Sequence, residues 1–181
     1  MMKKFLNILF LVFLTTNAWA KSGVNIFAYP RKVPESSIYN QYGKAFKLED
    51  FQGNFLLVVF WSKTCIPCLR EMESLNSFSK KVSSNGIHVL LVSPAEDWQT
   101  PEEQRAFLKR YKGEDLDFYV DKKASLASDF GIFTSPHTVL INADSMEIGR
   151  IRGSVDWDDS DVVEYIYKIK AQHQGLGPED E

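Results

Sequence analysis

A run of eight residues at 54–61, NFLLVVFW, constrains the fold of this chain more than any other segment. It is apolar at every position after the first, so it lacks the alternation of a strand that faces water on one side. A strand of this kind is covered on both faces, which requires helices above and below a sheet. The run therefore predicts a central strand in a layered α/β domain.

The rest of the chain predicts helices and strands in alternation. A helix over 65–82 aligns Met72, Leu75, Phe78 and Val82 into one apolar stripe. The other expected elements are a strand at 87–92, a helix from an N-cap at Thr100 to about 111, a short strand at 117–120, a short helix at 124–130, a hairpin of 138–141 and 147–152, and a helix at 158–171. An irregular lead-in precedes them, with a short strand or two and a small hairpin at 43–46. This order of elements favours a mostly parallel sheet covered by helices.

The composition fits a single globular domain. The chain has 181 residues, of which 44% are hydrophobic and 25% charged, and these values argue against disorder as its main state. The 21 basic and 24 acidic residues give a formal net charge of −3, and no block of Lys or Arg offers a surface to nucleic acid. Two cysteines are too few for a disulfide scaffold or for a zinc site built wholly from cysteines. We expect a monomer with no nucleic-acid partner.

Residues 1–20 have the pattern of a secretory signal peptide. Lys3 and Lys4 are followed by a mostly apolar run at 5–14 and by Ala18-Trp19-Ala20, which fits a small-x-small cleavage site. The alternative, an uncleaved membrane anchor, is disfavoured because the run is shorter than the ~20 apolar residues that a span needs. The expected division is a signal peptide at 1–20, a domain at 21–172 with a lead-in at 21–50, and a disordered acidic tail at 173–181. The expected location is the periplasm.

One motif, Cys65-Ile66-Pro67-Cys68, carries the chemistry and lies between the buried strand and the first helix. At a helix N-terminus the dipole and the unpaired N–H groups stabilise an anion, so a thiolate there has a depressed pKa. Cys65 is the expected exposed nucleophile, and Cys68, one turn later, is expected to point inward and resolve the mixed disulfide. Thr64 is the expected N-cap, and Pro67 is tolerated in the first turn.

A lone pair of cysteines at this spacing has other interpretations: half of a metal site, a structural clip or chance. A metal site needs further ligands, and His88, His137 and His173 do not have ligand spacing. A clip that spans two residues constrains the unfolded chain very little. The context of strand, motif and helix therefore favours a redox-active dithiol, Cys65 and Cys68, with no metal site and no organic cofactor.

Two segments resemble a known family. Residues 60–72, FWSKTCIPCLREM, are similar to the active-site segment of thioredoxin-like proteins, and most of all to the TlpA/ResA-like exported thiol-disulfide reductases. Residues 131–142, GIFTSPHTVLIN, resemble the family segment that ends in a cis-proline, a Thr and a strand, and residues 48–54 resemble its lead-in. The resemblance implies an α/β thioredoxin fold with an N-terminal extension, a central mixed sheet flanked by helices, and an extra segment between Ser93 and Lys123.

The resemblance also implies a substrate site beside the dithiol. It makes the peptide bond from Ser135 to Pro136 cis, which leaves the Ser135 backbone free to pair with an extended substrate segment. Ile66 and Pro67 of the motif would border the same shallow groove. Trp61 would belong partly to the core and partly to the floor of the site.

Two ionisable residues near the motif have a functional and a plainer interpretation. Glu71 lies three residues after Cys68 and matches a family Glu that can accept the Cys68 proton or tune its pKa. The alternative is a solvated helix acid. His137 can stabilise the Cys65 thiolate if its ring faces that way, and the alternative is a surface histidine on a strand.

The sequence departs from the family at three positions. Thr64 stands where a Trp commonly precedes the first cysteine, and His137 follows the proline where cytochrome-maturation members often carry an acid. Ile66-Pro67 replaces the Gly-Pro of cytosolic thioredoxin, so its redox potential does not transfer. Trp98 and Trp157 are interpreted as ordinary packing.

The expected function is that of a periplasmic thiol-disulfide oxidoreductase, most of all a reductase of substrate protein disulfides. By resemblance, its substrates would belong to cytochrome c or copper-centre assembly, and a membrane thiol-reductant donor would re-reduce the dithiol. A disulfide-forming oxidant would use the same motif in the reverse direction. A copper-binding assembly protein would instead use the two thiolates and His137 as ligands.

Overall fold

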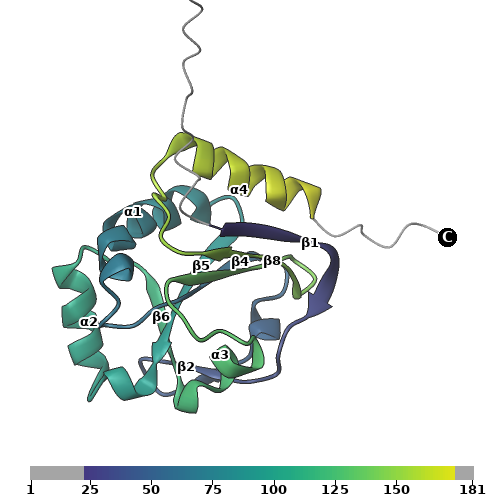
Figure 1. Ribbon diagram of the computed structural model, residues 1–181. Helices are drawn as coiled ribbons and strands as arrows, with labels where there is room; N and C mark the ends of the chain where they lie inside the picture. The colour runs from purple at the N-terminus through teal and green to yellow at the C-terminus, as the bar shows by residue number, and fades with distance from the viewer. Residues whose placement is uncertain (1–22, 174–181) are drawn as a thin grey trace, which may run out of the picture.

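Eight strands form one mixed sheet in the computed structural model, which describes residues 23–173 (Figure 1). The order of the strands across the sheet is β1-β8-β7-β4-β5-β6-β2-β3. Their bounds are β1 (Gly23–Lys32), β2 (Ile38–Asn40), β3 (Ala45–Phe46), β4 (Phe55–Phe60), β5 (Ile87–Pro94), β6 (Asp117–Asp121), β7 (His137–Ile141) and β8 (Met146–Arg152). The α-helices are α1 (Ile66–Ser83), α2 (Pro101–Arg110), α3 (Ser125–Asp129) and α4 (Ser160–Gln172), joined by the short 3-10 helices η2 (Leu48–Phe51), η3 (Ala95–Asp97) and η4 (Lys122–Ala124).

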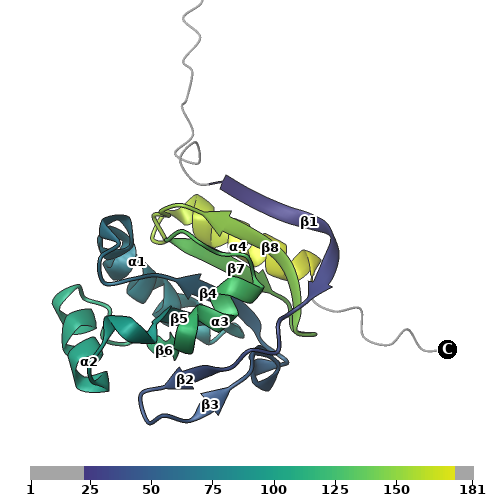
Figure 2. The same ribbon diagram turned by 60° about the horizontal axis from the view of Figure 1, so that its bottom comes forward.

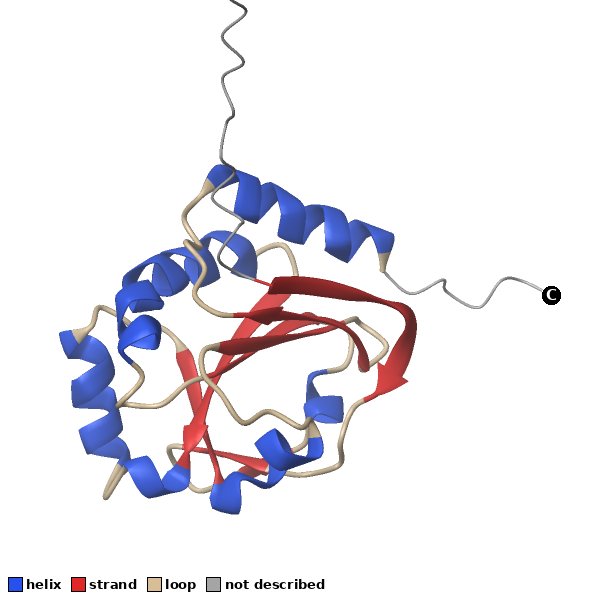
Figure 3. Ribbon diagram, in the orientation of Figure 1, coloured by secondary structure: helices blue, strands red, loops and turns tan. Residues whose placement is uncertain are grey.

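The apolar run at 54–61 forms β4, the central strand, and all six residues of β4 are buried. β4 pairs in parallel with β5 and antiparallel with β7, so that Val58 lies opposite Leu90 on one side and Val139 on the other. Alternate side chains of a strand point to opposite faces, and those of β4 enter two hydrophobic cores. Leu57 belongs to the core that includes residues of α1 and α4, whereas Leu56 belongs to the core that includes residues of η2 and α3. Figure 3 shows helices on both sides of the sheet.

The strand directions differ from those that the order of elements favours. Of the seven strand pairings within residues 23–173, β4–β5 and β5–β6 are parallel, and the other five are antiparallel. The expectation of a mostly parallel sheet is therefore wrong, whereas the mixed sheet that the resemblance implies is confirmed. A strand buried on both faces has the same apolar pattern in either direction, so the pattern does not distinguish β5 from β7.

The lead-in supplies both edges of the sheet and is not an irregular segment. β1 is ten residues long and pairs antiparallel with β8, with a shift of register between Ile26 and Arg31. β2 and β3 form the expected hairpin, which turns at Gly43 with φ of 76°, and β2 joins this hairpin to β6 (Figure 2). Because β1 is mostly exposed, it has little of the apolar periodicity from which a long strand is predicted.

The helices follow the predicted patterns closely. All four residues of the stripe in α1 are buried. The Thr100 hydroxyl accepts a hydrogen bond from the Glu103 N–H at 3.1 Å and caps α2, as expected. Within residues 23–173, no helix is long and apolar enough to cross a membrane. The predicted signal peptide at 1–20 and all but the first residue of the predicted tail at 173–181 lie outside the described residues.

Candidate active site

The two cysteines form a disulfide at the N-terminus of α1, with an S–S distance of 2.08 Å. Cys65 is the N-cap, and its Sγ accepts a hydrogen bond from the Cys68 N–H at 3.3 Å. Cys65 is half-buried and Cys68 is 1% exposed, which confirms the outward and inward positions predicted for them. The prediction of Thr64 as N-cap is wrong, because the helix begins at Ile66 and the Thr64 hydroxyl instead lies 3.1 Å from that of Ser62.

The position of Cys65 gives its sulfur a favourable electrostatic environment. The first turn of α1 contains no acidic residue, and its N–H groups point toward the cap. Together with the helix dipole, these groups stabilise a negative charge on the cap residue. The site can therefore hold a nucleophilic thiolate when the disulfide is reduced.

A cis peptide bond joins Ser135 to Pro136, as the resemblance implies. Ser135 is exposed and precedes β7, and the Pro136 carbonyl accepts a hydrogen bond from the Gly153 N–H at 3.0 Å. These residues line an open groove of about 800 Å³ together with Pro67 of the motif. The other residues that line the groove are Arg70, Glu71, Glu73 and Ser74 of α1, and Ser154, Val155, Asp156 and Asp158.

Glu71 is buried at the floor of this groove, and only 5% of its surface is exposed. Its Oε2 accepts a hydrogen bond from the Val155 N–H at 2.8 Å. Burial raises the pKa of Glu71 to about 7, while the Val155 N–H and the side chain of Trp157 lower it. The interpretation of Glu71 as a solvated helix acid is therefore wrong. The carboxyl shares the buried face of α1 with Cys68 and can gain or lose a proton near neutral pH.

His137 is also buried, with 5% of its surface exposed, so it is not a surface histidine. As the first residue of β7, it lies opposite Phe60 of β4 and Arg152 of β8. Burial, together with the positive charges of Arg150 and Arg152, lowers the pKa of His137 to about 4. The imidazole is therefore neutral at neutral pH and supplies no positive charge to a Cys65 thiolate.

Trp61 belongs both to the core and to the lining of the site, as the sequence predicts. It is 1% exposed and packs against the rings of Trp98 and Phe107, whose centroids lie 5.6 Å and 6.2 Å away. It also lines a second, mostly apolar cavity of about 310 Å³, which extends to Phe133 and Ser135 beside the cis-proline. Phe133 is 86% exposed at the border of this cavity.

The segment 153–157 contributes groups that the sequence did not indicate. Val155 donates its N–H to Glu71 across 84 residues of sequence. The backbone N–H of Trp157 donates to the Ser74 hydroxyl at 3.3 Å, and this hydroxyl donates to the backbone carbonyl of Glu71 at 3.0 Å. The side chain of Trp157 packs in the core, as predicted, while its backbone joins α1 to the loop before α4. Because these contacts use backbone groups and a distant loop, they leave no signal in the local sequence.

The copper-binding alternative requires the two cysteines and His137 to come together. Within residues 23–173, no group of three or more His, Cys, Asp or Glu side chains is placed to hold a metal ion. The imidazole of His137 instead lies within the electrostatic influence of Arg150 and Arg152.

Relatives of known sequence match most of the domain. The model of the Redoxin family matches residues 30–166. Thiol-disulfide oxidoreductase ResA of Bacillus thuringiensis subsp. konkukian is 28% identical over 141 residues, which cover 77% of this chain and 77% of the relative. Thioredoxin-like protein YneN of Bacillus subtilis is 26% identical over 114 residues, which cover 62% of this chain and 64% of the relative.

Solved structures share the fold. A putative thiol:disulfide interchange protein DsbE from Chlorobium tepidum superposes with a TM-score of 0.65 at 21% identity, over 77% of this chain and 95% of that one. StoA from Bacillus subtilis superposes with a TM-score of 0.59 at 19% identity, over 80% and 96% of the two chains. With the dithiol and the cis-proline in place, these likenesses show that the chain belongs to the Redoxin family and is a TlpA/ResA-like thiol-disulfide oxidoreductase of the thioredoxin-like superfamily.

Proposed function

We propose that this oxidoreductase works as a reductase of substrate protein disulfides, of the type that serves cytochrome c or copper-centre assembly. The observation that carries the proposal is the buried Glu71 carboxyl in the groove beside the dithiol. A strong oxidant of the DsbA kind depends on a strongly stabilised reduced form. Here the neighbouring groups do not add such stabilisation, because His137 is neutral, Ile66 is apolar and the Glu71 carboxyl becomes negative as it loses its proton.

The proposed cycle begins with the reduced dithiol. The Cys65 thiolate attacks one sulfur of the substrate disulfide, and the other substrate sulfur leaves as a thiolate, so that a mixed disulfide forms. Glu71 then accepts the proton of the Cys68 thiol. The Cys68 thiolate attacks the Cys65 sulfur, and the second substrate thiolate leaves. The substrate has gained two electrons, and the protein retains the Cys65–Cys68 disulfide.

A membrane thiol donor would return two electrons to this disulfide and complete the cycle. The dithiol itself carries the electrons, so the proposal requires no organic cofactor. We place the cycle outside the cytoplasm because residues 1–20 have the pattern of a signal peptide. Sequencing the N-terminus of the exported protein should give Lys21, and a chain that retains Met1 in the membrane would favour the anchor.

The substrate is proposed to bind as an extended segment. The proposal is supported by the exposure of Ser135 next to the cis-proline, where its backbone could pair with an extended segment. Ile66 is 61% exposed and Phe133 is 86% exposed, and both offer apolar contacts near the motif. An open groove of this kind offers few specific contacts to an extended segment, so the selected set of substrates should be narrow but imperfect.

The reduction potential of the Cys65–Cys68 pair against glutathione tests the direction of the reaction. We expect a value closer to the ~−270 mV of thioredoxin than to the ~−120 mV of DsbA. A value near that of DsbA would overturn the proposal in favour of the disulfide-forming oxidant.

Trapping tests the substrates. In Cys68→Ser, Cys65 can still attack a substrate but cannot be displaced, so mixed disulfides should accumulate in the cell envelope. We expect a small set that includes a haem- or copper-assembly protein and a membrane reductant. A broad set of newly exported proteins would support the oxidant, and an empty trap with copper bound to the reduced wild-type protein would support the copper-binding alternative.

A further inference from the structure

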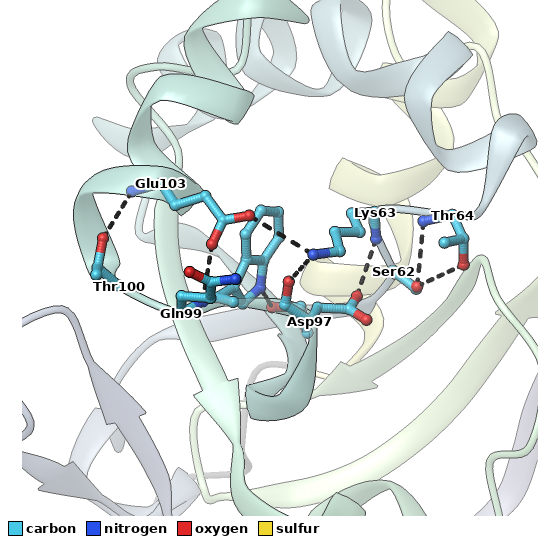
Figure 4. Close-up of polar contacts among 9 residues, drawn as sticks. Ser62, Lys63, Thr64, Asp97, Gln99, Thr100 and Glu103 are labelled. Carbon is cyan, nitrogen blue, oxygen red and sulfur yellow. Dashed lines mark hydrogen bonds and ion pairs between the residues drawn. The ribbon is translucent and has the colours of Figure 1, made fainter.

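The loop that precedes the nucleophile is held by a segment far away in the sequence. Lys63 stands two residues before Cys65, in the connection from β4 to α1. Its backbone N–H donates a hydrogen bond to Oδ2 of Asp97 at 3.0 Å, across 34 residues of sequence. Figure 4 shows that Asp97 and Glu103 approach this loop together from the connection between β5 and α2 and from α2 itself.

The side chain of Lys63 makes further contacts with the same segment. Its ammonium group donates to the backbone carbonyl of Asp97 and lies 3.6 Å from Oε1 of Glu103. The ammonium nitrogen also lies 5.3 Å from the centre of the Trp98 ring. The ion pair is partly exposed, with 35% and 41% of the two side chains accessible, so its charge attraction alone contributes little free energy. The hydrogen bonds, the ion pair and the contact with the Trp98 ring together fix the position of Lys63.

The segment that holds Lys63 is itself anchored to the sheet. The indole N–H of Trp98 donates to the Ser93 hydroxyl of β5 at 2.8 Å, and the ring packs on Trp61. Oε2 of Glu103 accepts the Gln99 N–H at 2.8 Å. Lys63 therefore contacts a segment that is fixed at both of its ends, by Trp98 and by the start of α2.

The position of Lys63 bears directly on the cap of α1. The Cys65 N–H donates to the Ser62 carbonyl at 3.0 Å, so residues 62–65 form a tight turn. The Ser62 hydroxyl lies 3.1 Å from that of Thr64 and accepts the Thr64 N–H at 3.3 Å (Figure 4). A displacement of Lys63 would move Cys65 relative to the N–H groups of α1. Their effect on a charge falls off within the first turn, so a small displacement weakens it.

We propose that Asp97 and Glu103 are positioning residues for the nucleophile. Together with Lys63 and Trp98 they form a latch that keeps the Cys65 sulfur at the N-cap of α1, where the thiolate is stabilised. Asp97, Trp98 and Glu103 belong to the segment between Ser93 and Lys123, so this segment gains a role in the dithiol chemistry of the protein.

The principal test compares Asp97→Ala with Asp97→Asn by alkylation of Cys65 in the reduced full-length protein. At a pH below the pKa of the Cys65 thiol, Asp97→Ala should react about threefold more slowly, which corresponds to a rise of about half a unit in that pKa. Asp97→Asn should react almost as fast as the wild type, because an amide oxygen can accept the same N–H. Peptide mapping separates Cys65 from Cys68. If Asp97→Ala lowers the melting temperature but leaves the pH profile of Cys65 unchanged, the latch is structural only and the proposal is overturned.

Glu103→Ala gives a second test that does not depend on the folding of Asp97→Ala. If Glu103 positions Lys63, loss of the carboxylate that contacts Lys63 and accepts the Gln99 N–H should loosen the loop and slow alkylation. If Glu103 only neutralises the Lys63 ammonium, the freed positive charge should favour the Cys65 thiolate and speed alkylation. Glu102→Ala is the matched control, because Glu102 is the exposed neighbour of Glu103 on α2. A rate that is faster than the control, or equal to it, would overturn the proposal.

Discussion

Glu71 and His137 are equally buried, yet they differ in the chemistry that they can perform. Burial disfavours the charged form of both residues, and it therefore raises the pKa of Glu71 to about 7 and lowers the pKa of His137 to about 4. Glu71 lies on α1 in the groove, whereas His137 begins β7 between two other strands. At neutral pH only the carboxyl is close to its pKa.

The partners of the two residues explain the difference. Val155 donates an N–H to the Glu71 carboxylate, which opposes part of the effect of burial and keeps the pKa in the neutral range. His137 instead faces the positive charges of Arg150 and Arg152, which add to the effect of burial. Equal burial therefore makes one residue a proton acceptor and the other a neutral part of the sheet.

The largest effect that we expect from this difference is on the free energy of unfolding as a function of pH. The folded protein keeps the Glu71 proton to higher pH than the unfolded chain, so the contribution of Glu71 to stability is greatest below pH 4.5 and falls as the pH rises to about 7. The unfolded chain takes up a His137 proton below pH 6.5, but the folded protein does so only near pH 4, so the contribution of His137 falls on acidification.

When either residue is substituted, the pH dependence of the free energy of unfolding should show the effect of the other residue alone. Glu71→Gln should lose stability from pH 6.5 toward pH 4, and His137→Gln should lose it from pH 4.5 toward pH 7, each by up to about 3 kcal/mol. In the wild type the two slopes oppose each other where the ranges overlap. Urea titrations at closely spaced pH values measure all three curves. Two variants with parallel curves would contradict the opposite pKa shifts.

A somewhat smaller effect is expected on the rate at which Cys68 resolves the mixed disulfide. Glu71→Gln should slow this step about a hundredfold at neutral pH, near the low end of what a positioned base contributes. His137→Gln should leave it within about twofold of the wild type. Rapid-quench measurement of substrate release from a preformed mixed disulfide isolates the step. Equal slowing in both variants would mean that packing, and not proton transfer, connects these residues to the reaction.

The parts of the site that could be predicted are those whose cause is local in the sequence. The run at 54–61 predicts β4, and the boundary between strand and helix predicts which of Cys65 and Cys68 is exposed. The sequence predicts the cap at Thr64, one residue before its actual place at Cys65, because helix boundaries vary by a residue or two and the capping contact depends on geometry.

The parts that could not be predicted depend on contacts between distant segments. Nothing near Glu71 in the sequence indicates that Val155 contacts it, so neither the burial of Glu71 nor its pKa can be predicted from the sequence. The same holds for Lys63 and Asp97, whose contact requires the fold to be known. Strand direction belongs to this group as well, since it is set by connections and not by the apolar pattern.

The smallest effect should separate the two partners that lower the pKa of Glu71. Val155 acts through its backbone and cannot be removed by substitution, whereas the side chain of Trp157 lowers the pKa of Glu71 although its buried indole nitrogen makes no hydrogen bond in the structure. Trp157→Phe keeps an aromatic ring next to Phe78, whose ring centroid lies 5.3 Å from that of the indole, and removes the indole N–H. Loss of the indole N–H should then raise the pKa of Glu71, and the pH profile of Cys68 alkylation should move to higher pH with it. Because Glu71 is protonated in both proteins near pH 5, the difference in melting temperature there measures the packing loss alone. An alkylation profile that does not move would mean that the Val155 N–H, and not the side chain of Trp157, lowers the pKa of Glu71.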